Sequence, residues 1–450
     1  MTPPPRNLAH PATSERTRAR MSVLERRYTG LPDDTTRRAY RLLSVVPLSA
    51  LDADATANAC SVSHEDAAAI LRQLDDAHLL KRLGPQPGRE VAYRFTEAGR
   101  EHAHQHARTE DSVDVVDDAV RRAGSWLLAT FTRAERILTP HHRQLDRDLH
   151  HQVPAYAFAD DNPAAALLWV EAHLPDVKLM AREARRRDWH EMAWQLVHAA
   201  WPAFHHLRPL ELSWELHSLG VQAAEACGNR VALREMLTTG AIALRGLRRV
   251  QVAFAWAERA SVLALEDGDL RGRAQANHEL GVCSRELGLR EAAVQYLYDA
   301  RVWREDSGDR RGAALTRIVQ GQIHLDDGRP QKAIDRVGPA HTDLRDVNDP
   351  INAGRACLVL AEAHAHLDRL PRTLGLLDEA HTYFERAGHP PGQARVLKAR
   401  GRLAQKAGRI DEARTCYTAA LNLYPQSSPD AADIAALLKG LPEQRASPSA

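Results

Sequence analysis

Four basic residues share one face of a predicted helix near the end of the chain, namely Arg395, Lys398, Arg402 and Lys406. Their spacing of i, i+3, i+7 and i+11 forms a continuous stripe, and Arg355 stands at the position that matches Arg395 in the preceding repeat of the sequence. Cationic side chains bind carboxylates through charge-assisted hydrogen bonds. The stripe therefore predicts a binding site for a protein or peptide with an acidic side chain or a free C-terminal carboxylate. The alternative is a solvated, arginine-rich helix face.

Histidine is abundant, with 23 residues, and some of these residues could bind a metal ion. His102 and His106 are four residues apart on one predicted helix, and the other groups are His141-His142, His150-His151 and His364-Ala365-His366. A zinc site needs three or four converging ligands, and one helical pair supplies two. The sequence therefore predicts solvated or packed histidines and no metal.

The sequence shows no catalytic motif. Its histidines, cysteines and carboxylates form no catalytic pair, and no nucleophile elbow occurs. The phosphate-binding loop G-x-x-x-x-G-K-[ST] is absent as well, so no segment would cradle a nucleotide. We therefore expect a protein without enzymatic activity that binds neither a nucleotide nor another cofactor.

Composition narrows the class of protein. The 450 residues include 60 basic and 59 acidic side chains, and this balance gives no general attraction to nucleic acid. The five cysteines form no C-x-x-C pair, which is typical of thiols in a reducing compartment. No apolar run has the roughly 18 residues of a membrane span, and the first residues lack the apolar core of a secretory signal. The sequence thus predicts a cytoplasmic protein without membrane contact.

The N-terminal part of the chain predicts a small domain after a polar tail. Residues 1–21 are basic and rich in Pro, Ser and Thr, and we expect them to be disordered. Residues 22–107 predict a winged-helix-like domain. Its first helix ends before Pro47, a short helix follows at 52–59, and Ser63 is the N-cap of a third.

The predicted third helix and the wing bear on DNA binding. Residues 78–83 and 90–95 alternate like two strands and predict the wing. The third helix carries one basic residue, Arg72, against four acidic ones, Glu65, Asp66, Asp75 and Asp76. Acidic side chains oppose phosphate contact, so this helix argues against DNA binding. The basic residues of the wing keep a DNA-binding transcriptional regulator as the alternative: Lys81, Arg82, Arg89 and Arg94.

The second half of the chain repeats. Residues 108–229 predict a helical linker with a degenerate repeat, and the segment 230–429 contains repeats of about 40 residues each. Small residues recur in columns at this spacing: Gly281, Gly321, Ala361 and Gly401; Ala260, Ala300, Ala340, Ala380 and Ala420; and Gly228, Gly268, Gly308, Asn348 and Gly388. The first two columns allow neighbouring helices to approach closely, and the third suits helix ends. Residues 430–450 predict a capping helix and a disordered tail.

Within one repeat, Gly281, Ala293, Leu297 and Ala300 resemble the tetratricopeptide signature, although such repeats usually have about 34 residues. We therefore expect longer helices or loops than usual. In tetratricopeptide stacks the first helix of each repeat lines a concave groove, which would place the basic stripe inside it. The predicted fold is all-α, with a small winged-helix module followed by a tetratricopeptide superhelical solenoid.

The order of segments resembles the C-terminal half of actinobacterial NB-ARC regulators, which are signal-transduction NTPases of the STAND class. The resemblance rests on YTGLPDDTTRRAYRLLSVVPL, YRFTEA, LTPHHR, FADDNPAAALLWVEAHLPD and HEMAWQLVHAAW, followed by the repeats. Two departures are the missing phosphate-binding loop and Thr96-Glu97, which stands where the family usually has a His-Asp pair. The resemblance implies a non-enzymatic regulatory or signalling protein that binds a partner through its repeats, with the winged helix as a coupling module.

Overall fold

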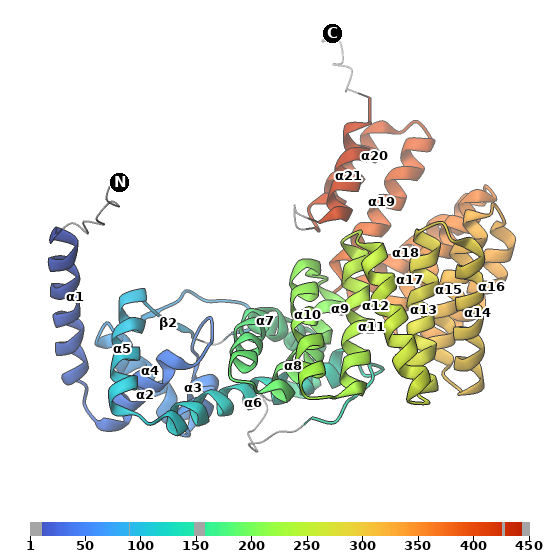
Figure 1. Cartoon of the computed structure of the whole chain (residues 1–450). Helices are drawn as coiled ribbons and strands as arrows, with labels where there is room; N and C mark the ends of the chain where they lie inside the picture. Colours follow the sequence, from blue (N-terminus) through green and yellow to red (C-terminus); the bar gives the residue numbers. More distant parts are fainter. Residues whose placement is uncertain (1–10, 90, 148–157, 425–427, 443–450) are drawn as a thin grey trace, which may run out of the picture. The chain divides into compact units, whose positions relative to one another are not determined.

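The computed structural model describes residues 11–89, 91–147, 158–424 and 428–442 (Figure 1). The described chain is mostly α-helical, which confirms the predicted all-α class, and it forms two compact units, residues 1–202 and 203–450. In these described ranges no helix is both long and apolar enough to cross a lipid bilayer.

Within the first unit, residues 34–110 form three helices, two strands and a further helix, in the order expected for a winged helix. The elements are α1 (Pro11–Thr29), α2 (Asp34–Val45), α3 (Ala53–Cys60), α4 (His64–Asp76), β1 (Leu80–Arg82), β2 (Tyr93–Phe95), α5 (Glu97–Glu110), α6 (Val113–Leu138), the 3-10 turn η1 (Ala159–Asp161), α7 (Pro163–Arg186) and α8 (His190–Ala199). The N-cap predicted at Ser63 is confirmed, because its hydroxyl accepts a hydrogen bond from the Asp66 amide. Asp33, Asp52 and Thr96 cap α2, α3 and α5 in the same way.

The two strands are antiparallel and shorter than predicted. Leu80 pairs with Phe95 and Arg82 pairs with Tyr93, while Leu51 bridges to the other side of Tyr93. The exposed residues of the ladder are basic and its buried residues are apolar. Burial alternates in β2 as predicted, but not in β1, where Lys81 and Arg82 are both exposed. Residue 90, at the start of the second predicted strand, lies outside the described residues.

Helix α1 corrects one prediction. Residues 11–21 are helical, although the sequence predicted disorder for residues 1–21; residues 1–10 lie outside the described part of the chain. The helix is anchored at its C-terminal end by Leu24 and Tyr28, which are buried in the first unit. These two apolar anchors follow the polar run, so composition alone did not reveal them.

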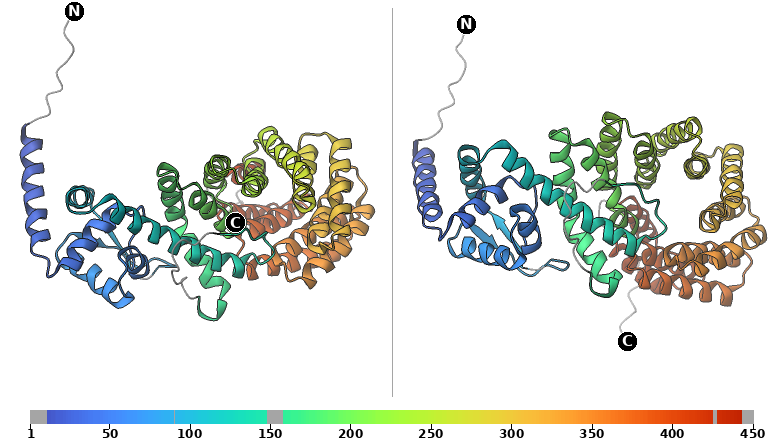
Figure 2. Two further views of the ribbon diagram at one scale, coloured as in Figure 1. Left: turned by 60° about the horizontal axis from the view of Figure 1, so that its bottom comes forward. Right: turned by 90° about the horizontal axis from the view of Figure 1, so that it is seen from below.

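The second unit is a regular stack of antiparallel helices. Its elements are α9 (Trp201–His206), which starts just before the boundary, α10 (Leu210–Ala226), α11 (Arg230–Gly246), α12 (Val250–Glu266), α13 (Leu270–Glu286), α14 (Arg290–Asp306), α15 (Arg310–Asp326), α16 (Pro330–Asp346), α17 (Pro350–His366), α18 (Leu370–Arg386), α19 (Pro390–Lys406), α20 (Ile410–Leu421) and α21 (Pro429–Lys439). Seen from below, the helices of this unit follow an arc from green through yellow to red (Figure 2, right). The capping helix expected after residue 430 is α21, whose Ile434 is buried.

Each helix from α10 to α19 has 17 residues. Short turns of equal length connect these helices, and a residue with positive φ occurs at every twentieth position from Asp188 to Gly408. At Gly268, for example, φ is 66°, and the next amide, of Asp269, donates to the carbonyl of Ala264. This arrangement ends a helix with a left-handed residue. The repeat is therefore longer than usual because its helices are longer. The predicted column from Gly228 to Gly388 has one residue per repeat of 40, so it contains every second one of these helix ends.

The small-residue columns lie where helices of one repeat meet. A Cβ added to Gly321 would stand 2.2 Å from Val337, and one added to Gly401 would stand 2.5 Å from Tyr417. Ala300, Ala340, Ala380 and Ala420 are all fully buried. These contacts explain why the columns hold small residues.

Candidate ligand-binding site

The candidate site consists of four arginines from distant parts of the second unit. Arg208 precedes α10, Arg245 is in α11, Arg355 is in α17 and Arg395 is in α19. Their side chains lie close enough for their charges to affect one another's pKa values. The first helices of successive repeats also contact one another, as α11 does with α13 and α15 with α17. We call these four residues the inner arginine cluster.

Arg355 is held in an environment that disfavours its charge. Its Nη1 donates a hydrogen bond of 2.7 Å to Oδ1 of Asn352, and the amide of Asn352 carries no charge. Burial, followed by the charges of Arg395 and Arg245, lowers the pKa of Arg355 to about 10. A guanidinium is ordinarily titrated only above pH 12. The environment of Arg355 therefore favours an added negative charge.

Arg208 lies near the start of the second unit, and its positive charge is disfavoured for the same reasons as that of Arg355. Burial, followed by the charge of Arg395, lowers its pKa to about 10, and Asp430 opposes this effect. Its backbone has φ of 52°, in the left-handed region that costs a non-glycine residue energy. Arg208 thus holds a strained helix-end position that elsewhere in the unit is often glycine.

Arg245 differs from Arg208 and Arg355, because acidic residues accompany it. Its Nη1 donates to Glu286 Oε1 at 3.0 Å, and its Nη2 lies 3.7 Å from Glu279 Oε2. Burial raises the pKa of Glu279, although Arg245, Arg304 and Arg355 oppose this effect. Glu279 and Glu286 thus balance the positive charge of Arg245 more fully than acidic residues balance the charges of Arg208 and Arg355.

Neutral histidines lie beside the cluster. Burial and the nearby charges of Arg304, Arg355 and Arg245 hold the pKa of His278 well below its usual value. Burial and the charges of His205, Arg395, His206 and Arg208 do the same for His389. Burial and the neighbouring positive charges thus act in the same direction, and both disfavour protonation of these imidazoles.

The two ends of the second unit meet near the cluster. Arg248, in the turn after α11, lies 2.7 Å from Asp433 and 3.7 Å from Asp430, both in α21. Lys398 of α19 lies 3.9 Å from the same Asp433 carboxylate. His206 donates a hydrogen bond from Nδ1 to the Ala387 carbonyl at 3.0 Å. The arc of repeats is closed by these contacts between its first and last members.

Comparison with known proteins identifies the repeat. The tetratricopeptide repeat family matches residues 355–426. The second unit is a solenoid of helix pairs, and this matched segment, from α17 to α20, has the tetratricopeptide repeat. No curated protein matches the chain.

Several solved structures resemble the chain at low identity. A Rap protein complexed with competence and sporulation factor is 11% identical, with 71% of this chain and 95% of that chain covered and a TM-score of 0.46. Aspartyl phosphate phosphatase F from Bacillus subtilis is 10% identical, with 99% of each chain covered and a TM-score of 0.46. A signal transduction ATPase with numerous domains and a tetratricopeptide repeat sensor, from Pyrococcus horikoshii, is 14% identical, with 88% of this chain and 60% of that chain covered and a TM-score of 0.35. Similarities of this degree do not assign a function.

The solenoid brings only part of the predicted basic stripe to the cluster. Arg355 and Arg395 belong to it, and Lys398 lies next along α19, half-buried beside Asp433. Arg402 is exposed, and its charge lowers the pKa of Lys398 after burial has done so. Lys406 lies about 16 Å along the helix axis from Arg395, where it forms an exposed pair with Asp368 at 3.5 Å. Lys406 is therefore the predicted residue farthest from the inner arginine cluster.

The sequence interpretation missed Arg208 and Arg245. Arg245 stands four repeats before Gln405, and Gln405 lies three residues after Arg402 on the helix face that carries the stripe. Comparing this face with the same face of the earlier repeats would have found Arg245. Arg208 precedes the regular repeats, and it lies near Arg395 only because the first and last helices of the second unit come together. No sequence pattern signals such a contact between the ends of a stack.

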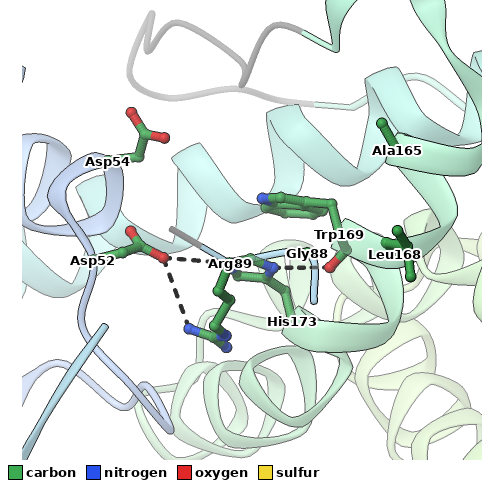
Figure 3. A pocket seen from close by; sticks show the side chains of 8 residues that line it. All are labelled: Asp52, Asp54, Gly88, Arg89, Ala165, Leu168, Trp169 and His173. Atoms are coloured by element: carbon green, nitrogen blue, oxygen red, sulfur yellow. Dashed lines mark hydrogen bonds and ion pairs between the residues drawn. The ribbon is translucent and has the colours of Figure 1, made fainter. Parts of the chain in front are cut away.

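A second candidate site lies in the first unit, in a pocket of about 270 Å³ lined by Asp52, Asp54, Gly88, Arg89, Ala165, Leu168, Trp169 and His173 (Figure 3). Arg89 is almost completely buried and pairs closely with Asp176, and it also donates to the Ala172 carbonyl at 2.9 Å. His173 stacks on Trp169 at 4.0 Å and lies 3.4 Å from Asp52. The charged groups at this pocket have protein partners, so they tie the loops of the N-terminal domain to α7.

Gly88 shows how closely the turn between the strands approaches α7. A Cβ added at this position would stand 2.1 Å from the Leu168 carbonyl oxygen, and φ is 74°. The turn therefore packs against helix backbone, and Arg89, predicted as a basic residue of the wing, is not exposed. Lys81, Arg82 and Arg94 are exposed, as are Glu65, Asp66 and Asp76 of α4.

Proposed function

We propose that the chain is a non-enzymatic regulatory protein whose solenoid binds a protein or peptide partner through a carboxylate. The observation that carries the proposal is the inner arginine cluster, in which Arg208 and Arg355 are half-buried and, among their charged neighbours, are affected most by the like charge of Arg395. An acidic side chain or a C-terminal carboxylate placed among them would relieve this repulsion. Each charge-assisted hydrogen bond would contribute roughly 1.5–3 kcal/mol.

The cluster suits a carboxylate for a geometric reason as well. A guanidinium binds a carboxylate through two parallel hydrogen bonds, and arginine cannot lose its proton under physiological conditions. Lys398 and Arg402 extend the positive surface along α19 toward acidic residues elsewhere on the partner. We therefore assign Arg355 and Arg395 to the central contact and Lys398 and Arg402 to its edge.

We further propose that residues 22–107 are a winged helix that couples the solenoid to other parts of a signalling assembly in the cytoplasm. The packing of Gly88 against α7 and the burial of Arg89 support this role, since a wing used on DNA keeps its basic tip accessible. The acidic surface of α4 opposes phosphate contact. The exposed Lys81, Arg82 and Arg94 favour the second candidate, a DNA-binding regulator whose repeats sense a peptide.

The experiment that tests partner binding uses a library of peptides displayed with free C-terminal carboxylates and a second library with amidated ends. We expect selection of peptides that bind through a carboxylate, and we expect Arg355→Ala with Arg395→Ala to weaken their binding at least tenfold. Because the arginines repel one another, Arg395→Ala should leave the melting temperature unchanged or raise it. Loss of binding together with loss of stability would contradict the proposal.

The matched control is Lys406→Ala, which removes an exposed cation from the same helix. This variant should bind the selected peptides as tightly as the unchanged protein. If Lys406→Ala weakened peptide binding as much as the double variant of Arg355 and Arg395, the attraction would be general and the cluster would not be the binding site. Selection of a DNA sequence by the full chain, lost in Arg82→Ala, would favour the second candidate.

A further inference from the structure

Two histidines and one glutamate of the first unit converge on one point. Helix α1 supplies Glu25, and α5 supplies His102 and His106. Oε2 of Glu25 lies 3.1 Å from Nε2 of His102 and 2.9 Å from Nε2 of His106, and the three groups offer ligand atoms within 4.8 Å of one another. Ligand atoms of a tetrahedral zinc ion lie about 3.3–3.6 Å apart, because bonds of about 2.0–2.2 Å meet at the tetrahedral angle. Small side-chain shifts would therefore admit an ion.

The second nitrogen of His106 is already oriented as in a metal site. Its Nδ1 lies 2.5 Å from Oε1 of Glu110. Glu110 is itself held by the Tyr28 hydroxyl at 3.0 Å and by Arg41 at 2.8 Å. Histidine ligands of metals commonly donate their other N–H to such a carboxylate, which fixes the ring and leaves Nε2 as the ligand atom.

Hydrogen-bond donors around His102 give the same assignment. The Tyr40 hydroxyl donates to the Gly99 carbonyl at 2.9 Å, so its oxygen accepts the N–H of His102 Nδ1 at 3.2 Å. A neutral His102 then presents the lone pair of Nε2 toward Glu25. In these tautomers two imidazole lone pairs and a carboxylate oxygen face one point, and either a proton on an Nε2 or a metal ion among the three groups stabilises that arrangement.

Two further groups with potential ligand atoms occur among the described residues, and they differ from this one. In the group of Glu135, His142 and His198, Arg147 already lies 2.5 Å from Glu135 and 2.7 Å from His198. That guanidinium supplies the positive charge. In the group of His341, Cys357 and Glu379, the thiol lies 3.3 Å from the imidazole. A metal bound there would have a sulfur ligand, which distinguishes its absorption spectrum from that of a site with nitrogen and oxygen ligands. This group lies in the second unit and serves as an internal comparison.

We propose that Glu25, His102 and His106 bind one divalent transition-metal ion of the zinc type, and that the ion fastens α1 to α5. The pair of histidines four residues apart supplies two ligands, and Glu25, 77 residues before His102, supplies the third. A fourth position remains for water or another ligand, as is typical of sites with two histidines and one glutamate. The prediction of no metal rested on the two histidines of α5, and Glu25 of α1 adds the third ligand.

The test uses full-length protein carrying Cys357→Ser, which removes the thiol of the comparison group, after treatment with a chelator. Cobalt is titrated and followed by visible absorption, and zinc is then added in competition. We expect one ion per chain with the spectrum of nitrogen and oxygen ligands. Glu25→Gln and His106→Gln should each weaken binding at least about tenfold, as should Glu110→Gln, which removes the carboxylate that orients His106.

Glu101→Gln is the matched control, because it removes an exposed carboxylate from the same helix. It should leave the affinity unchanged. Hydrogen exchange of residues 19–29 provides a second measurement, and zinc should slow it in the control and leave it unchanged in Glu25→Gln. Absence of saturable binding, or binding that Glu25→Gln leaves intact, would overturn the proposal.

Discussion

Arg248 and Asp433 form an ion pair of 2.7 Å although 185 residues separate them in the sequence. Both side chains are about half exposed, so the pair itself contributes only about 0.2–1 kcal/mol. Its importance is positional, since it joins the first regular repeat of the solenoid to the final helix. The pair closes the arc that gathers Arg208, Arg245, Arg355 and Arg395.

Arg248→Ala should therefore loosen α21 without unfolding the solenoid. We expect a loss of less than about 1 kcal/mol in the free energy of unfolding, because the pair is exposed to solvent. Hydrogen exchange in residues 429–439 should become faster by an amount that high salt reproduces in the unchanged protein. Arg259→Ala breaks another exposed pair, with Glu225, and should leave exchange in α21 unchanged.

Gly321→Ala should destabilise the solenoid. The new methyl group would meet Val337 at 2.2 Å in a close contact between two helices, and overpacking of this kind costs about 1–3 kcal/mol. Gly375→Ala is the control, because its Cβ position in α18 meets no other residue within 4 Å apart from its own helix and chain neighbours, and no proline follows it. The control should be unchanged or more stable by up to about 1 kcal/mol, as alanine favours a helix. Denaturant unfolding measures both, and equal effects would contradict the packing argument.

Asp176→Asn should destabilise the first unit strongly. Asp176 is the close partner of Arg89, and both side chains are almost completely buried. Removing one member of a buried ion pair costs about 3–5 kcal/mol, and Asp52, 3.8 Å from Arg89, would compensate the remaining charge only in part. Asp188→Asn, at an exposed carboxylate, should change stability by less than about 0.5 kcal/mol. Thermal unfolding of the two variants provides the comparison, and similar melting temperatures would show that the buried pair is dispensable.

Stability should fall when the pH is lowered below about 6.5, the ordinary pKa of histidine. The pKa of His389 is held well below that value by burial and by its charged neighbours, so the unfolded chain accepts a proton that the folded chain refuses. One such histidine lowers stability by up to about 1.4 kcal/mol per pH unit in this range. His389 Nδ1 also accepts the Gly392 N–H at 2.9 Å, and protonation removes this helix cap.

His389→Asn tests this origin of the pH dependence. Asparagine caps helices well, and Asn229 holds the corresponding position of the repeat that begins with α11. We expect a smaller difference in unfolding free energy between pH 7.5 and pH 5.5 in the variant, while His366→Asn, at an exposed position, should keep the difference of the unchanged protein. An unaltered difference in His389→Asn would assign the effect to other groups, such as His278.

The repeat was predictable because its causes are local. Gly281, Gly321 and Gly401 meet side chains of the next helix, and the same contact recurs at every repeat, so the requirement for a small residue appears as a column. The cap at Ser63 was recognisable for a similar reason, since a cap acts within three residues of itself.

The contacts that define the sites were not predictable in this way. Arg208 reaches the cluster across a closed arc, and Glu25 reaches His102 across 77 residues. Each of these side chains lies on a segment whose own pattern is ordinary. Their meeting depends on how the helices pack, which no spacing within one helix reveals. The basic stripe on α19 was visible, but its sequence could not show that Lys406 lies away from the cluster.

The left-handed residue at every twentieth position has a consequence for the length of the protein. Deleting or duplicating one whole repeat, a pair of helices with its two turns, would keep each helix in phase, and the stack would remain well formed locally. The arc, however, would turn through a smaller or larger angle before reaching α21, and Asp433 would no longer meet Arg248. The two ends of the solenoid therefore meet only when it has one particular number of repeats. Variants with another number would keep the helical stack and lose the inner arginine cluster.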